Sequence, residues 1–173
     1  MRIQAENYAL AQAKERGVRV MVVRIAPFTY GRGGSGIARF MGMAKNMGGL
    51  PTVNGGANRT TTVHVDDAVR LVLLAVEKGE AGEVFHAGSQ TEVTMGALFG
   101  AINASVGVPD KDITYDDAFA KFGENIAWFL RAENRASGAK ARKKLGWQPN
   151  GTPVLQDITS GSYVPVASAL LGK

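Results

Sequence analysis

Three glycines, Gly31, Gly33 and Gly36, have the spacing of a G-x-G-x-x-G motif. Between a strand and a helix, this spacing allows a tight turn, a close approach of the backbone to a pyrophosphate, and a helix N-terminus that faces the phosphate charge. The residue types and their order therefore suggest a dinucleotide-binding turn.

Two features of the surrounding sequence argue against that role. The apolar run before the glycines stops near Ile25, so five residues separate it from Gly31, whereas in the motif the strand runs almost into the first glycine. An acidic residue for the ribose should follow about 20 residues later, and residues 49–58 contain none. We therefore favour a flexible loop near a substrate over a cofactor turn.

The composition excludes several other kinds of site. The chain has 173 residues, no cysteine and two histidines without His-x-x-x-His spacing, so we predict neither a disulfide nor a metal site. No apolar run approaches about 18 residues, and residues 2–16 lack an apolar signal core. We expect a cytoplasmic protein without a membrane segment.

The net charge of +5 does not predict a nucleic-acid partner. Basic residues are scattered, and the one cluster, in residues 140–144, occupies a helix whose other face is apolar. A solvated helix face explains such a cluster, because nucleic-acid binders usually gather basic and aromatic residues on one surface. A mild positive balance also suits an anionic small substrate.

The elements that would position these residues alternate between helices and strands. Alanine-rich residues 2–16 predict a helix that ends at Gly17, and the β-branched run 18–23 predicts a strand covered on both faces, as in a parallel sheet. Further strands are expected at 60–64 and 84–87. Further helices are expected at 37–46, from a cap at Asp66 or Asp67 to about Lys78, at 95–106 after a Thr94 cap, at 116–122, at 125–131, and from Ser137 to near Leu145. Residues 26–36 and 48–58 read as loops.

In this order, the segments resemble the C-terminal half of extended or atypical short-chain dehydrogenases/reductases, which are NAD(P)-dependent epimerase/dehydratase-like proteins. The resemblance covers most of residues 2–150. It is carried by Gly-Val-Arg-Val-Met-Val-Val-Arg (17–24), Pro-x-x-Tyr-Gly-x-Gly (27–33), Val-His-Val-Asp-Asp (63–67), Gly-Glu-Val-Phe-His-Ala-Gly (82–88) and Ala-Lys-Ala-Arg-Lys-Lys-Leu-Gly-Trp-Gln-Pro (139–149).

The resemblance implies an α/β fold: a partial doubly wound, Rossmann-like parallel sheet with a small C-terminal helical substrate lobe, and with the N-terminal cofactor half absent. Residues 1–150 would be the C-terminal portion of the family's domain, and residues 151–173 a weakly structured tail. The implied cofactor is NAD or NADP, which we do not expect this chain to bind alone.

The family's acid/base pair is a Tyr-x-x-x-Lys motif with an acidic residue one helical turn later. Glu6 resembles that acidic residue, so Arg2 takes the place of the lysine and the tyrosine falls before Met1. Arg2 is thus the catalytic candidate by position, although a guanidinium cannot share a proton as an amine does. Tyr8 does not restore the motif, because Gln12 stands four residues after it.

The other candidates lie after the first strand. Pro27 and Phe28 match the turn that lies beside the nicotinamide in the family, and we take them as cofactor-binding candidates. Tyr30 and Arg32 match the loop that lines the substrate cleft, and we take them as substrate-binding candidates.

Two further candidates for substrate binding have structural alternatives. Arg59 resembles an arginine that often meets a substrate phosphate, for which its bidentate fork is suited, but it could equally be a solvated loop side chain. His64 could face the substrate or make a structural hydrogen bond.

Two functions remain open, and whether the chain is itself an enzyme is undecided. In the first, it is the substrate-binding part of an epimerase/dehydratase-type oxidoreductase acting on a nucleotide sugar or another small alcohol or ketone, and is inactive alone. In the second, it is a non-catalytic lobe that binds a small ligand or a protein. An unpaired sheet edge predicts a homo-oligomer in either case.

Overall fold

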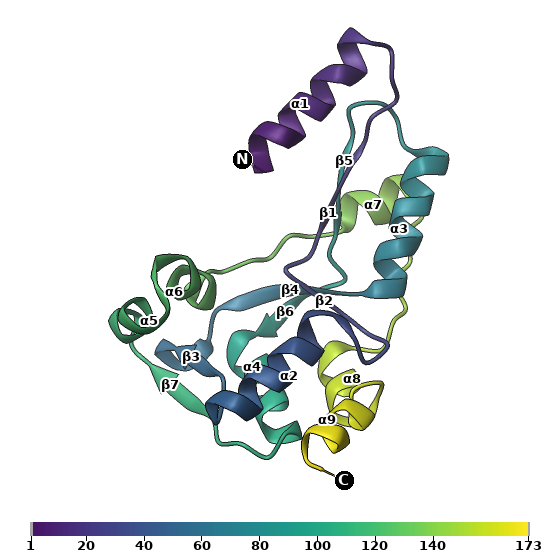
Figure 1. Cartoon of the computed structure of the whole chain (residues 1–173). Helices are drawn as coiled ribbons and strands as arrows, with labels where there is room; N and C mark the ends of the chain where they lie inside the picture. Colours follow the sequence, from purple (N-terminus) through teal and green to yellow (C-terminus); the bar gives the residue numbers. More distant parts are fainter. Residues whose placement is uncertain (1, 173) are drawn as a thin grey trace.

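The computed structural model describes residues 2–172, and of Arg2 and Lys14 it describes the backbone alone. The elements in chain order are α1 (Arg2–Glu15), β1 (Val22–Ile25), β2 (Phe28–Tyr30), α2 (Ser35–Met47), β3 (Pro51–Val53), the 3-10 helix η1 (Asn54–Gly56), β4 (Arg59–His64), α3 (Val65–Lys78), β5 (Val84–Ala87), β6 (Gln90–Thr94), α4 (Met95–Ser105), β7 (Lys111–Ile113), α5 (Tyr115–Phe122), α6 (Glu124–Arg131), α7 (Ala139–Leu145), α8 (Val154–Ser160) and α9 (Val164–Leu170). Figure 1 shows α1, β1, α3, β5 and α7 at one end, which we call the upper unit, and the other elements below, which we call the lower unit.

The upper unit is built on a parallel pair of strands. β1 and β5 run side by side from Val22 opposite Val84 to Ile25 opposite Ala87, and α3 and α7 pack against them. Their apolar faces meet in one buried cluster, which includes Leu71, Phe85, Leu145 and Trp147. The α/β class and the strand at 84–87 are confirmed.

The first strand differs from the expectation in place and in cover. It occupies 22–25 instead of 18–23, because its ladder can extend only as far as its four-residue partner β5. It is not buried on both faces either. Val18 and Ile25 are about half exposed, since α3 and α7 are the helices packed on this pair.

The lower unit holds the larger core. β4 pairs in parallel with β2 and antiparallel with β6, and β3 pairs with β7. Helices α2, α4, α8 and α9 pack around them and contribute buried residues such as Ile37, Met41, Leu98 and Ile102. Thr94 caps α4 as predicted, with its hydroxyl accepting from Ala97 N–H at 3.1 Å.

The two segments expected as loops each contain a short strand. β2 lies within 26–36 and β3 within 48–58, and each has three residues. A three-residue strand between glycines has no local periodicity to detect. Its structure comes from pairing with β4 or β7, which lie far along the chain.

The prediction of a weakly structured tail at 151–173 is wrong for its described residues. Residues 154–170 form α8 and α9, and Val154, Ile158 and Tyr163 are buried in the lower core. The low charge of this segment therefore reflects burial. The Tyr163 hydroxyl accepts from Gly31 N–H and donates to the Gly34 carbonyl, both at 2.8 Å.

The start of α3 also differs from the expectation. His64 is the N-cap, and its Nδ1 accepts from Asp66 N–H at 3.2 Å, so neither aspartate caps the helix. Asp67 is instead buried, and its carboxylate accepts from the N–H groups of Asn150 and Gly151, each at 3.0 Å. It also pairs with Arg70. These bonds tie α3 of the upper unit to the chain leading into α8 of the lower unit.

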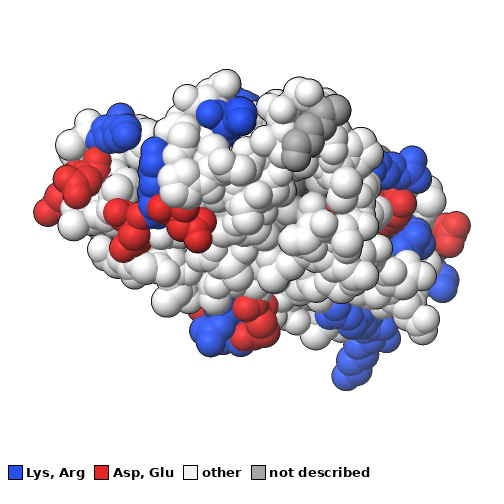
Figure 2. All heavy atoms as spheres, turned by 90° about the horizontal axis from the view of Figure 1, so that it is seen from below, with Lys and Arg blue, Asp and Glu red and all other residues white. Residues whose placement is uncertain are grey.

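Charged groups of both signs are interspersed on the surface. Figure 2 shows, on the face seen from below, basic and acidic side chains around the margin and other residues over the centre. Among residues 2–172, no helix is long and apolar enough to cross a bilayer.

We predict that Asp67→Ala destabilises the protein by roughly 2–4 kcal/mol, because two backbone N–H groups lose their acceptor in a buried place, at about 1–3 kcal/mol each. The measurement is the free energy of unfolding in urea. The matched control is Asp66→Ala, which removes a part-exposed carboxylate paired with Arg32 and should cost less than about 1 kcal/mol. Equal effects of the two variants would contradict this assignment.

Candidate functional site

A cleft of about 510 Å³ lies between the two units, at the carboxyl ends of β1 and β5. In open α/β sheets, ligands bind outside the carboxyl ends of the strands. The lining residues are Arg24, Ile25, Ala26, Pro27, Phe28, Thr60, Thr61, His86, Ala87, Gly88, Met95, Trp128, Phe129, Ala132, Glu133, Asn134 and Ala136.

One wall of the cleft is the segment 132–136, which is held tightly against β4. The Thr61 hydroxyl donates to the Asn134 carbonyl at 3.0 Å and accepts from Ala136 N–H at 2.9 Å. Gly88 lies so close that a Cβ would be 2.7 Å from Thr61 Cγ2 and would collide with the Ala136 carbonyl. Glycine is therefore required at 88 for this wall to close.

The polar end of the cleft is a row of three side chains. Arg24 donates to both carboxylate oxygens of Glu6, at 2.6 and 3.1 Å, and lies 3.4 Å from Nε2 of His86. The bond to Arg24 lowers the pKa of the Glu6 carboxyl. Burial, and then the charge of Arg24, lower the pKa of His86 below its ordinary 6.5. His86 is therefore a neutral imidazole at pH 7, able to accept or donate a hydrogen bond.

A second group of lining residues, which we call the aromatic end, consists of Phe28, Trp128 and Phe129. The rings of Phe28 and Phe129 lie 5.6 Å apart, and Phe28 is equally close to Phe40. Trp128 is 61% exposed although it lines the cleft. A ligand could thus stack on an indole that is largely uncovered.

Of the predicted residues, Pro27 and Phe28 line this cleft. Arg59 lies at its border, next to Thr60, and is engaged by two carboxylates. It pairs with Glu92 at 3.1 Å and Glu133 at 3.6 Å, and its own N–H donates to Glu133 at 2.8 Å.

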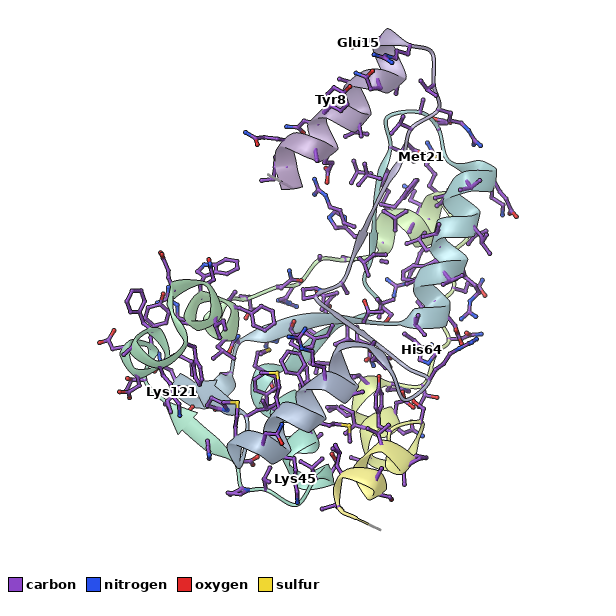
Figure 3. The ribbon with its side chains drawn as sticks, in the orientation of Figure 1. Tyr8, Glu15, Met21, Lys45, His64 and Lys121 are labelled. Atoms are coloured by element: carbon purple, nitrogen blue, oxygen red, sulfur yellow. The ribbon has the colours of Figure 1, made fainter. Side chains whose placement is uncertain are left out.

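Tyr30, Arg32 and His64 lie together, away from the cleft. Tyr30 lines a second cavity of about 530 Å³, donates to the Thr152 carbonyl at 2.8 Å, and has a pKa raised by burial. The His64 ring packs edge-on against Tyr30 at 5.4 Å, where β4 meets α3 (Figure 3). Arg32 is exposed and pairs with Asp66 at 2.9 Å.

The N–H groups of Gly31 and Gly33 are bound within the protein. Gly31 N–H donates to Tyr163, and Gly33 N–H donates to Ser162 Oγ at 2.9 Å. A Cβ at Gly31 would collide with the His64 ring, so these glycines serve close packing. Gly31 and Gly33 therefore do not offer their N–H groups to the phosphates of a dinucleotide.

The remaining catalytic candidate is Arg2, whose side chain lies outside what the structure describes. Tyr8 is on α1 and is 65% exposed (Figure 3). Within residues 2–172, no group of three His, Asp or Glu side chains is arranged to hold a metal ion.

Three residues that line the cleft, His86, Trp128 and Phe129, were not predicted from the sequence. His86 had one detectable signal. It alternates with Phe85 and Ala87 in a predicted strand, so it must face away from the side that buries them. Trp128 and Phe129 had none, because aromatic residues on a short helix are typical of a core.

Comparison with known proteins gives one family and consistent structural neighbours. The model of the NAD dependent epimerase/dehydratase family matches residues 1–88. An uncharacterized protein of Saccharomyces cerevisiae is 31% identical over 159 residues, which cover 91% of this chain and 53% of that protein. Another, of Schizosaccharomyces pombe, is 29% identical over 149 residues, covering 86% and 50%. The chain therefore spans about half the length of the curated relatives it matches.

Solved structures show the same fold. RMD from Pseudomonas aeruginosa, complexed with NADPH, superposes with a TM-score of 0.67 at 19% identity, covering 99% of this chain and 54% of its own. UDP-glucose 4-epimerase from Thermotoga maritima, with UDP-glucose, gives 0.66 at 25%, covering 95% and 50%. dTDP-glucose 4,6-dehydratase from Streptomyces venezuelae, with NAD bound, gives 0.67 at 24%, covering 93% and 47%.

We predict that Arg24→Met raises the pKa of His86, because a cation that disfavours the imidazolium is removed while Glu6, which favours it, remains. Titration of the ring C–H resonances by NMR measures this directly, since the chain has only two histidines. Arg32→Met, distant from His86, is the control and should leave the value unchanged.

The same pKa shift affects stability. Because the folded pKa of His86 is below the unfolded value of about 6.5, unfolding takes up a proton near and below that pH. The contribution of His86 to stability is thus complete above pH 6.5 or so and is lost as the pH falls through the folded value.

An unchanged or lower pKa of His86 in Arg24→Met would contradict the assignment.

Proposed function

We propose that this chain, which belongs to the NAD dependent epimerase/dehydratase family, forms the substrate-binding part of an NAD(P)-dependent oxidoreductase. Its substrate would be a nucleotide sugar or another small alcohol or ketone. The observation that carries the proposal is the cleft between the units, because it lies at the carboxyl ends of β1 and β5 and contains both a polar and an aromatic end.

The roles of the lining residues follow from their chemistry. His86, neutral at pH 7, would hold the substrate hydroxyl or carbonyl oxygen by a hydrogen bond, and Arg24 and Glu6 would fix its orientation. Trp128 and Phe129 would cover the body of the substrate and exclude water. Pro27 and Phe28 would border the place where a nicotinamide meets the substrate.

A bound NAD or NADP would supply hydride chemistry. In this chain, only Pro27 and Phe28 are proposed to border it. Structural neighbours contain NADPH or NAD, whereas Gly31 and Gly33 here donate their N–H groups to the protein itself. We therefore propose that the chain alone has no site for the dinucleotide phosphates and is inactive alone.

The test is an amide NMR titration of the chain with UDP-glucose and, separately, with the uncharged ketone benzylacetone. At least one of them should move the amide signals of Ala87, Gly88 and Asn134 in a saturable manner, because these residues line the cleft. The signals of Gly146 and Gly151, which line the second cavity, serve as the internal control.

Saturable shifts confined to the second cavity, or none with either compound, would refute the proposed substrate cleft. Calorimetry with NADH and NADPH should give no binding in the micromolar range. Micromolar affinity would refute the statement that the chain has no dinucleotide site of its own.

Self-association is a second candidate function, favoured by one edge of β1 with which no strand within residues 2–172 pairs. The N–H groups of Val22 and Ala26 bond toward β5, so those of Val23 and Ile25 point to the other edge. Ile25 is about half exposed. Such an edge is a template for pairing with a second copy.

We predict that Val23→Pro abolishes this association and leaves the ladder to β5 in place, because proline removes an N–H that β5 does not use. Some stability is lost with the packing of the Val23 side chain on the upper core. Light scattering at micromolar concentration should show a homo-oligomer for the unmodified chain and a monomer for the variant. A monomeric, cooperatively melting unmodified chain would contradict self-association.

A further inference from the structure

Three arginines in or beside the cleft are already paired with carboxylates. Arg24, which lines it, is bound by Glu6 through both carboxylate oxygens. Arg59 and Arg135 flank lining residues in the chain, and both pair with Glu92. Arg24, Arg59 and Arg135 thus each have an acidic partner in place, whereas Arg131, which precedes the lining residue Ala132, stacks on the ring of Tyr115.

The cluster of ion pairs around Arg59 carries no net charge. It consists of two arginines, Arg59 and Arg135, and two glutamates, Glu92 and Glu133. A phosphate that bound Arg59 would have to displace these carboxylates and would then lie beside them. The like-charge repulsion, more than the modest strength of exposed ion pairs, opposes such an exchange.

Glu133 adds to this effect because it lines the cleft itself. Its position is fixed, since it accepts the backbone N–H of Arg59 at 2.8 Å and is also paired with that side chain. A nucleotide diphosphate would therefore meet a carboxylate where it needs a cation. An uncharged substrate would meet no such penalty.

The aromatic end of the cleft has the opposite character. Trp128 and Phe129 line it with Phe28 and Met95. Behind Phe129 lies another cavity, of about 420 Å³, whose lining is almost wholly apolar and includes Phe40, Phe99, Phe122, Met43 and Met47. Phe129 lines both spaces, so apolar surface continues from the cleft into the lower unit.

We propose that the cleft takes an uncharged alcohol or ketone with an aromatic or alkyl body, and not a nucleotide diphosphate sugar. This inference rests on the proposed function and chooses between the two substrate classes left open there. The hydroxyl or carbonyl oxygen lies at the His86 end, and the apolar body stacks on Trp128.

The experiment is a fluorescence titration of the chain with benzylacetone and with UDP-glucose, with Trp128 as the reporter and buried Trp147 as the reference. Benzylacetone should change the emission saturably and bind at least roughly tenfold more tightly than UDP-glucose. The change should disappear in Trp128→Phe. Tighter binding of UDP-glucose would overturn the inference and leave the proposed cleft intact, whereas binding of neither would overturn both.

A charge-releasing variant tests the reason for the exclusion. The double variant Glu92→Gln and Glu133→Gln leaves an amide oxygen as a hydrogen-bond acceptor at each position. It removes the negative charges that pair with Arg59 and Arg135. Its affinity for UDP-glucose should rise by roughly tenfold or more, with that for benzylacetone unchanged.

The matched control is Glu77→Gln with Asp116→Asn, which changes the net charge equally at exposed positions of α3 and α5. It should change neither affinity. A gain of UDP-glucose binding in the control as large as in the Glu92 and Glu133 variant, or none in that variant, would overturn the inference.

Discussion

The buried carboxylate of Asp67 is the contact on which the placement of the two units depends. A carboxylate removed from water must be compensated by hydrogen bonds, and this one is compensated by two backbone N–H groups and by Arg70. The backbone carbonyl of Asp67 accepts from Trp147 Nε1 at 2.9 Å. Because the cleft is the space between the units, its width follows from this junction.

Several groups that could bind an anion, in the glycine loop and beside the cleft, are bound by the protein itself. The amides of Gly31 and Gly33 donate to the turn before α9, and Arg59 near β4 is paired with glutamates. The same residue types that favour a phosphate in sequence thus stabilise the fold. What remains accessible is a neutral imidazole at one end and aromatic rings at the other, which is an amphipathic site.

Sequence patterns predicted most elements whose signal is local. The Thr94 cap of α4 and the strands at 60–64 and 84–87 needed only neighbouring residues. Pro27 and Phe28 were named from the family resemblance, and both line the cleft. The features that the sequence did not predict depend on contacts between residues far apart in the chain. The three-residue strands β2 and β3 exist by pairing with distant strands. Asp67 binds Asn150 and Gly151, and His64 is the cap. Val154 and Ile158 pack in a core that includes α4. Arg59 illustrates the limit for sites: its type was identified, but not the carboxylates that occupy it.

The bond from Gly31 to Tyr163 spans 132 positions of the chain. During synthesis on a ribosome, the turn after β2 emerges long before Tyr163, whose hydroxyl accepts the hydrogen bond from Gly31. Contacts of such high sequence separation slow folding, since a large loop must close before they contribute. The glycine-rich turn is thus expected to reach its native conformation late in folding. Until then it is accessible to chaperones and proteases.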